Sequence, residues 1–208
     1  MSLEIWIAFS LASAALLAIP GPTILLVVSY ALGRGRASGW ATVPGVALGD
    51  LTAMTVSLLG AGAVLATSAS LFSALKLVGA AYLIWLGIKM WRSHADLGQL
   101  RGIKTSQSNW SMFRTAYVVT SLNPKSIVFF IAFVPQFIDP ARAPLPQFSI
   151  MIATFVLMAA VNVALWAIMA GTMRARFERP ETLRIANRIG GSFLIGAGLL
   201  TATLRRSA

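Results

Sequence analysis

The sequence has no cysteine, a single histidine and few charged residues for its length. Of its 208 residues only 11% are Asp, Glu, Lys or Arg, whereas a soluble domain carries about 25%. The absence of cysteine excludes disulfides, thiolate metal sites and cysteine nucleophiles. The low charge content excludes an ordinary soluble globule, because too little of its surface could be polar.

Hydrophobic residues make up 57% of the chain and fall into long uncharged runs. A bilayer core about 30 Å thick needs roughly 20 apolar residues per helix. Six runs approach or exceed that length, and they predict six transmembrane helices at residues 5–33, 37–66, 71–91, 115–138, 147–173 and 189–204. The composition therefore predicts an all-α, polytopic membrane protein in which residues 1–208 form one transmembrane domain.

The basic residues give a net charge of +11, but they flank the predicted helices and form no single patch. Nucleic-acid binding is therefore not expected. Contact with membrane lipids is expected instead. Twelve Lys and Arg residues border one side of the membrane and four border the other. The twelve are Arg34, Arg36, Lys89, Arg92, Arg101, Lys104, Arg114, Arg174, Arg176, Arg179, Arg184 and Arg188, and the four are Lys76, Arg142, Arg205 and Arg206. The positive-inside rule places the twelve in the cytoplasm, which predicts two periplasmic termini and an even number of spans.

The two halves of the chain resemble each other. Residues 79–87 align without a gap to residues 190–198, with four of nine positions identical at an offset of 111, and an offset of 112 places Asp50 over Asn162. This pattern predicts two three-helix repeats, about 1–92 and 112–208. Because three is odd, the second repeat would be inverted in the membrane, as in many secondary transporters. The alternative is chance similarity between two helices rich in Gly and Leu.

The first predicted helix is interrupted near its centre by Pro20-Gly21-Pro22. Proline lacks an N–H group and crowds the carbonyl four residues earlier, so the two prolines would free the carbonyls of Leu16 and Ala18. Unpaired backbone groups are costly in lipid, and the break should face a protein interior or a watery cavity. The alternative is a kink that only improves packing.

The fourth predicted helix contains a corresponding interruption, Asn123-Pro124-Lys125, about 102 residues further on. Pro124 would free the carbonyl of Thr120 by the same mechanism. Lys125 lies too deep to reach the cytoplasmic interface, so we expect it to pair with Asp50, with freed carbonyls or with a substrate carboxylate. Half-helix ends of this kind form the substrate sites of many transporters.

Asp50 lies near the middle of the second predicted helix. A carboxylate there costs at least about 2.5–3.5 kcal/mol, so it should face the bundle interior and either pair or take up a proton. It is the expected proton-coupling residue, with a structural ion pair as the alternative. Asn162 either lines the same cavity or bonds across helices. The predicted substrate-binding residues are thus Pro20, Gly21, Pro22, Asp50, Asn123, Pro124, Lys125 and Asn162.

These residues, together with GRGR at 33–36, GVALGD at 45–50, GAAYLIWLG at 79–87 and FVPQF at 133–137, resemble the LysE/RhtB family of lysine exporters and homoserine/threonine resistance proteins. The resemblance covers essentially the whole chain. It implies an amino-acid exporter of the bacterial inner membrane, driven by the proton or membrane-potential gradient, with a small amino acid or similar zwitterion as its substrate.

Three alternatives stand beside this interpretation. A carrier of an inorganic cation could use Asp50 and freed carbonyls, although Lys125 would oppose it. An intramembrane enzyme would need a nucleophile with a base, or a metal site, and no His, Cys or second carboxylate lies in the predicted helices. A scaffold without cargo would have little reason to carry Asp50, Lys125 and two broken helices. No cofactor or metal is expected, and the oligomeric state, a homo-oligomer included, stays open.

Overall fold

The computed structural model describes residues 1–92, 107–139, 142–172 and 180–203, and every regular element in these ranges is helical. The helices are α1 (Leu3–Ala18), α2 (Pro22–Arg34), α3 (Gly39–Thr67), α4 (Ala69–Arg92), α5 (Asn109–Ser121), α6 (Pro124–Val128), α7 (Pro144–Thr172) and α9 (Pro180–Thr203). A 3-10 turn at Arg36–Ser38 precedes α3, and a π-helical turn at Phe129–Phe133 and a 3-10 turn at Val134–Phe137 extend α6. The predicted all-helical class is confirmed.

Three helical stretches of the described chain are long and apolar enough to cross a membrane, namely Arg36–Val64, Asn109–Phe137 and Pro144–Ala170. A fourth candidate is the pair α1 and α2, which bends by 53° at its break. These candidates confirm a protein with several membrane spans. The predicted cytoplasmic loops lie largely at 93–106 and 173–179, outside the described residues, so the orientation remains a prediction.

Several helices begin earlier than the charge pattern predicts. α5 begins at Asn109, six residues before the predicted span, because the Ser108 side chain caps its N-terminus by accepting a hydrogen bond from the Ser111 N–H. α9 begins at Pro180 and not at residue 189. The uncharged runs therefore mark the apolar part of each helix, while capping residues set where the helix begins.

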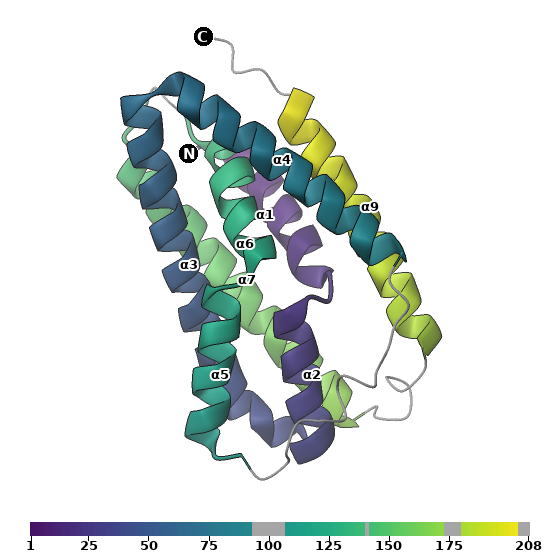
Figure 1. Cartoon of the computed structure of the whole chain (residues 1–208). Helices are drawn as coiled ribbons and strands as arrows, with labels where there is room; N and C mark the ends of the chain where they lie inside the picture. Colours follow the sequence, from purple (N-terminus) through teal and green to yellow (C-terminus); the bar gives the residue numbers. More distant parts are fainter. Residues whose placement is uncertain (93–106, 140–141, 173–179, 204–208) are drawn as a thin grey trace.

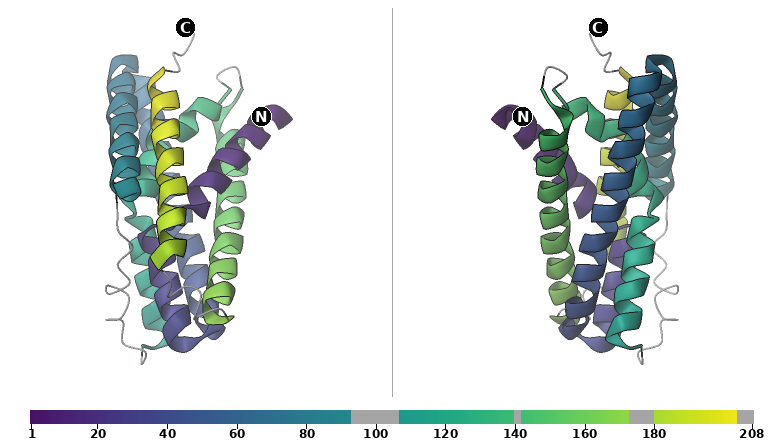
Figure 2. Two further views of the ribbon diagram at one scale, coloured as in Figure 1. Left: turned by 90° about the vertical axis from the view of Figure 1, so that its right-hand side faces the viewer. Right: turned by 90° about the vertical axis from the view of Figure 1, so that its left-hand side faces the viewer.

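The helices form an elongated bundle in which the two broken pairs, α1–α2 and α5–α6, run beside the long helices α3 and α7 (Figure 1). α4 and α9 pack along each other on one flank. α1 begins and α9 ends at the same end of the bundle (Figure 2). Gly35, with φ of 76°, closes the turn after α2 in a conformation that favours glycine.

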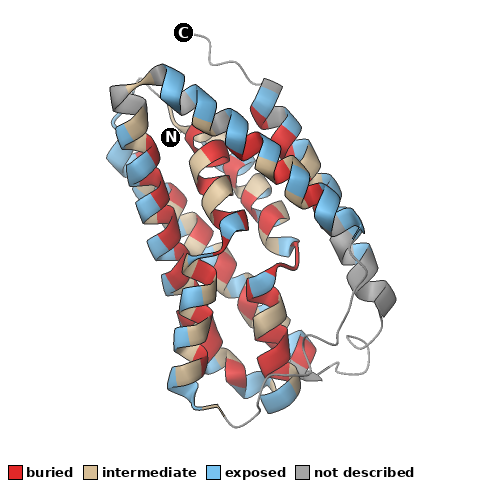
Figure 3. Ribbon diagram, in the orientation of Figure 1, coloured by how far each residue is buried: buried red, intermediate tan, exposed pale blue. Residues whose placement is uncertain are grey.

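Buried and exposed residues alternate along the helices, and buried ones gather toward the middle of the bundle (Figure 3). The exposed residues include large apolar side chains such as Leu11, Val56, Leu59 and Leu157, as on helices that face lipid. Inside, one apolar cluster is rich in aromatic rings, including Phe9, Phe129, Phe130, Phe133 and Phe155. A second, aliphatic cluster is built from residues of α2, α3, α5 and α7.

Glycines bring α4 and α9 into close contact. A Cβ at Gly87 would lie 2.6 Å from the Gly191 carbonyl oxygen, and one at Gly198 would lie 2.7 Å from the Ala80 carbonyl oxygen. Only a hydrogen atom fits at these positions, so the two backbones touch directly, which is a common way for membrane helices to associate.

Candidate functional site

The break between α1 and α2 lies where the sequence predicts it. α1 ends at Ala18, Ile19 is extended, and α2 begins with Pro22 at its first position and extended Gly21 as its N-cap. Pro22 is tolerated there because the first N–H of a helix has no partner within the helix. Only three residues, 19–21, therefore separate the C-terminus of one half-helix from the N-terminus of the next.

The second break separates α5 from α6. α5 ends at Ser121, and Pro124 opens α6 at the first helical position. The Asn123 side chain caps α6 through Oδ1, which accepts a hydrogen bond from the Lys125 N–H at 3.1 Å. The carbonyl of Thr120, predicted to be freed, accepts instead from the Asn123 N–H at 3.1 Å. The Thr120 carbonyl and the Lys125 N–H therefore both find partners within the break itself.

Lys125 crosses from the second break to the first. Its side chain is 8% exposed, and Nζ donates to the carbonyl oxygens of Leu16 at 3.2 Å and Ile19 at 3.0 Å. Of the three partners considered for this lysine, the structure has the freed carbonyls. Its positive charge thus lies at the C-terminus of α1, where the helix dipole is negative.

Gly21 allows this close approach. A Cβ at this position would lie 3.3 Å from Lys125 Nζ and 3.4 Å from Cε, so any side chain would crowd the lysine head group.

Asn162 of α7 holds another carbonyl of the same break, with Nδ2 donating to Leu17 O at 3.0 Å. The carbonyls held by side chains are therefore those of Leu16, Leu17 and Ile19. The Leu16 carbonyl, predicted to be freed, also accepts from the Ile19 N–H at 3.3 Å, as the Thr120 carbonyl does from Asn123 in the second break. Among the described residues no side chain donates to the Ala18 carbonyl.

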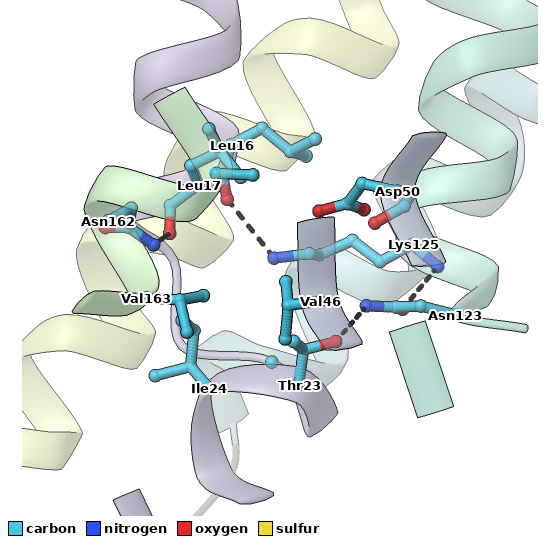
Figure 4. Close-up of a pocket in the computed structure, with 13 residues that line it drawn as sticks. Leu16, Leu17, Thr23, Ile24, Val46, Asp50, Asn123, Lys125, Asn162 and Val163 are labelled. Carbon is cyan, nitrogen blue, oxygen red and sulfur yellow. Dashed lines mark hydrogen bonds between the residues drawn. The ribbon is translucent and has the colours of Figure 1, made fainter. Parts of the chain in front are cut away.

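Asp50 of α3 points into the same region (Figure 4). It is 3% exposed and lines one pocket with Lys125. The carboxylate and the ammonium influence each other electrostatically, but among the described residues Asp50 forms neither a salt bridge nor a hydrogen bond with another group. The carboxylate is thus buried, close to a cation and without a direct partner.

The pocket has a volume of about 30 Å³, which is room for about two water molecules at ~10–15 Å³ each. Five of the eight predicted site residues line it, and the three prolines shape the breaks beside it. The lining comprises Leu16, Leu17, Gly21, Thr23, Ile24, Val46, Asp50, Asn123, Lys125, Ser126, Ala159, Asn162 and Val163. Polar and helix-breaking residues from four different helices therefore converge on one place.

Thr23 belongs to this pocket and was not among the predicted residues. Its hydroxyl accepts from Asn123 Nδ2 at 3.3 Å and lies 3.3 Å from the Thr120 hydroxyl. It thereby links α2 to both sides of the second break. Its position directly after Pro20-Gly21-Pro22, in the first turn of a half-helix, is the signal that could have identified it.

Comparison with known proteins places the chain among bacterial membrane proteins. A family model described as "LysE type translocator" matches residues 14–204. An uncharacterized membrane protein of Vibrio cholerae is 33% identical over 99% of this chain and 100% of its own length. A protein of Salmonella typhimurium named "Homoserine/homoserine lactone efflux protein" is 32% identical over 100% of both chains. A "Leucine efflux protein" of Enterobacter sp. is 26% identical over 89% of both chains. No solved structure matches the chain.

Proposed function

The chain belongs to the LysE type translocator family, and we propose on that premise that it exports an amino acid or a closely related amine across the inner membrane of a bacterium. Family membership makes it a transport protein and not an enzyme. The observation that carries the proposal is that Asp50, Lys125 and residues of both helix breaks line one and the same pocket. Such a pocket inside a bundle of apolar helices is typical of a secondary transporter.

The relatives suggest the class of substrate. Homoserine, homoserine lactone and leucine, the compounds in their names, share a primary amine. The carboxyl group is not shared in ionised form, because it is closed into a ring in the lactone. A substrate of this class would place its ammonium near Asp50 and its carboxylate, where it has one, near Lys125 and the N-terminus of α2.

We further infer six spans arranged as two inverted three-helix repeats, about 1–92 and 112–208, with both termini in the periplasm. The close contacts between α4 and α9 support this arrangement. Shifted by the repeat offset of 111, the contact of Gly87 with Gly191 becomes the contact of Gly198 with Ala80, and both are present. In the same way, Gly87 approaches Ile195 and Gly198 approaches Ile84. At a pseudo-two-fold axis, each contact between two repeats is expected to have a partner contact in which the two repeats have swapped roles.

Asp50 is the proposed proton-coupling residue. It is buried in the pocket, it has no direct partner, and a proton taken up there would remove the only acidic charge that lines the pocket. Loss or gain of that proton would favour one of the two access states over the other, because the two states expose the carboxyl group to different solutions.

Flux measurements test the proposal. Purified protein is reconstituted into liposomes, a pH gradient is imposed, and the transport of radiolabelled homoserine and leucine is followed. We expect gradient-dependent flux in the wild type and its loss in Asp50→Asn. The matched control is Asp139→Asn, the same change at a residue outside the pocket that pairs with Arg142, and it should transport normally. Absence of gradient-dependent flux for every amino acid tested, or an unimpaired Asp50→Asn, contradicts the proposal.

A further inference from the structure

The end of α1 is an unusually negative place in the protein interior. Its last turn carries the partial negative charge of a helix C-terminus, and the carbonyls of Leu16, Leu17 and Ile19 there accept hydrogen bonds from buried side chains. The carbonyls of Leu16 and Ile19 are both occupied by one ammonium group, that of Lys125. The arrangement is therefore a cation-binding site built from backbone, and the protein fills it with its own side chain.

Asp50 adds a full negative charge to the same pocket. Its carboxylate is almost completely buried and forms no direct ion pair or hydrogen bond among the described residues. One ammonium thus faces a carboxylate and a helix C-terminus together. A buried carboxylate without a direct partner is costly, so a positive group that reached Asp50 would be stabilised there.

We propose that the C-terminal carbonyls of α1, together with Asp50, bind the ammonium group of the substrate, and that Lys125 occupies this place only until the substrate enters. The inference rests on the proposed export function and specifies its binding site. A primary ammonium has three N–H groups. Two of them would donate to Leu16 O and Ile19 O, as Lys125 Nζ does, and the third would be left for the Asp50 carboxylate, which Lys125 does not bond.

The size of the pocket agrees with this exchange. A cavity of about 30 Å³ holds about two waters and cannot hold an amino acid while the lysine head group lies inside it. Withdrawal of Lys125 vacates both the space and the two carbonyls. The displaced lysine is then available to a substrate carboxylate, but a lactone without one would still bind through its ammonium.

This geometry predicts the chemical selectivity of the transporter. An amine with at least two N–H donors can replace the lysine, whereas a trimethylated nitrogen has none and an acylated nitrogen carries no charge. The site therefore accepts primary amines and rejects N-acyl and N-trimethyl derivatives of the same compounds.

Chemical rescue of Lys125→Ala tests the site without relying on transport. Ethylammonium should bind in the space left by the lysine head group and raise the melting temperature of the purified variant. At about 100 times its dissociation constant, the expected rise is roughly 5–10 °C. Tetramethylammonium, which has no N–H group, should have no effect. The matched control is Lys89→Ala, which removes an exposed lysine near the end of α4, and ethylammonium should not stabilise it. No stabilisation of Lys125→Ala, or equal stabilisation by both cations, overturns the proposal.

A second measurement uses the unmodified protein and decides the question if Lys125→Ala does not fold. Thermal stabilisation is compared for leucine methyl ester, which keeps the ammonium but not the carboxylate, and for 2-hydroxy-4-methylpentanoate, which keeps only the carboxylate. We expect the ester to stabilise the protein and the hydroxy acid to have no effect at 100-fold higher concentration. The reverse order, or stabilisation by neither compound, overturns the proposed site.

The two proposals can fail separately. If amino-acid flux is found while ethylammonium leaves Lys125→Ala unchanged and the hydroxy acid binds, the site assignment is wrong and export stands. If ethylammonium binds and no amino acid is transported, the site stands and export is wrong.

Discussion

Replacing Gly198 by alanine should weaken the contact between α4 and α9. The added Cβ would lie 2.6 Å from Ile84 Cγ1 and 2.7 Å from the Ala80 carbonyl oxygen. The isoleucine can change rotamer, but the carbonyl belongs to the helix backbone and cannot turn away. The two helices must therefore move apart by several tenths of an ångström, which opens gaps along the rest of the interface.

The magnitude follows from a comparison within the same helix. A Cβ at Gly196 meets nothing within 4 Å, so Gly196→Ala changes only the helix propensity, by up to about 1 kcal/mol in favour of alanine. The same gain applies at Gly198 and cancels in the difference between the two variants. The remainder is the cost of overpacking, about 1–3 kcal/mol, or roughly 2–12 °C in melting temperature at ~2–4 °C per kcal/mol.

Thermal unfolding of both purified variants in the same detergent measures this difference. Gly196→Ala should melt at or slightly above the wild-type temperature, and Gly198→Ala should melt below it. Gly87→Ala extends the comparison to α4, because its Cβ would lie 2.6 Å from the Gly191 carbonyl oxygen, and it should cost about as much as Gly198→Ala. Equal melting temperatures for the Gly196 and Gly198 variants would refute the reasoning from close backbone contact.

Two further substitutions address the breaks. Asn123→Ala removes the cap on the Lys125 N–H and the bond to the Thr23 hydroxyl, and loss of the cap alone should lower the stability by about 0.5–2 kcal/mol. Asn123→Ser keeps a capping oxygen and should recover part of this loss in a thermal melt. Equal melting temperatures for the two variants would contradict the capping role. Asn162→Leu leaves the Leu17 carbonyl without its side-chain donor. Chemical denaturation should then show a free energy of unfolding lower by about 1–3 kcal/mol. An unchanged stability would show that this carbonyl has another partner.

The existence of both breaks and their positions along the chain could be predicted from the sequence, because proline acts on its immediate neighbours. The missing N–H and the crowded carbonyl are properties of the residue itself. Which backbone carbonyls find which partners depended on how many residues each break includes. Side chains hold the carbonyls of Leu16, Leu17 and Ile19, so only Leu16 of the pair predicted from ring sterics is among them. In the second break, a backbone turn satisfies Thr120.

The partner of Lys125 could not be chosen from the sequence. Three partners were compatible with its depth, and the choice depends on where the fold places α6 relative to the end of α1, more than 100 residues away in the chain. Hydrophobic periodicity indicates which face of a helix is buried, but it does not indicate which helix covers that face. The predicted repeat agrees with part of this arrangement, since Asp50 and Asn162, aligned at an offset of 112, line the same pocket from α3 and α7.

The bond from Lys125 to the end of α1 also bears on how binding is communicated through the molecule. Through Lys125, the helix break in the second half of the chain is hydrogen-bonded to the helix break in the first half. A ligand that displaces the Lys125 side chain therefore acts on both halves at once. Coupling between the halves then needs no long relay of side chains, because the atoms that bind the ligand are also the atoms that connect the two breaks.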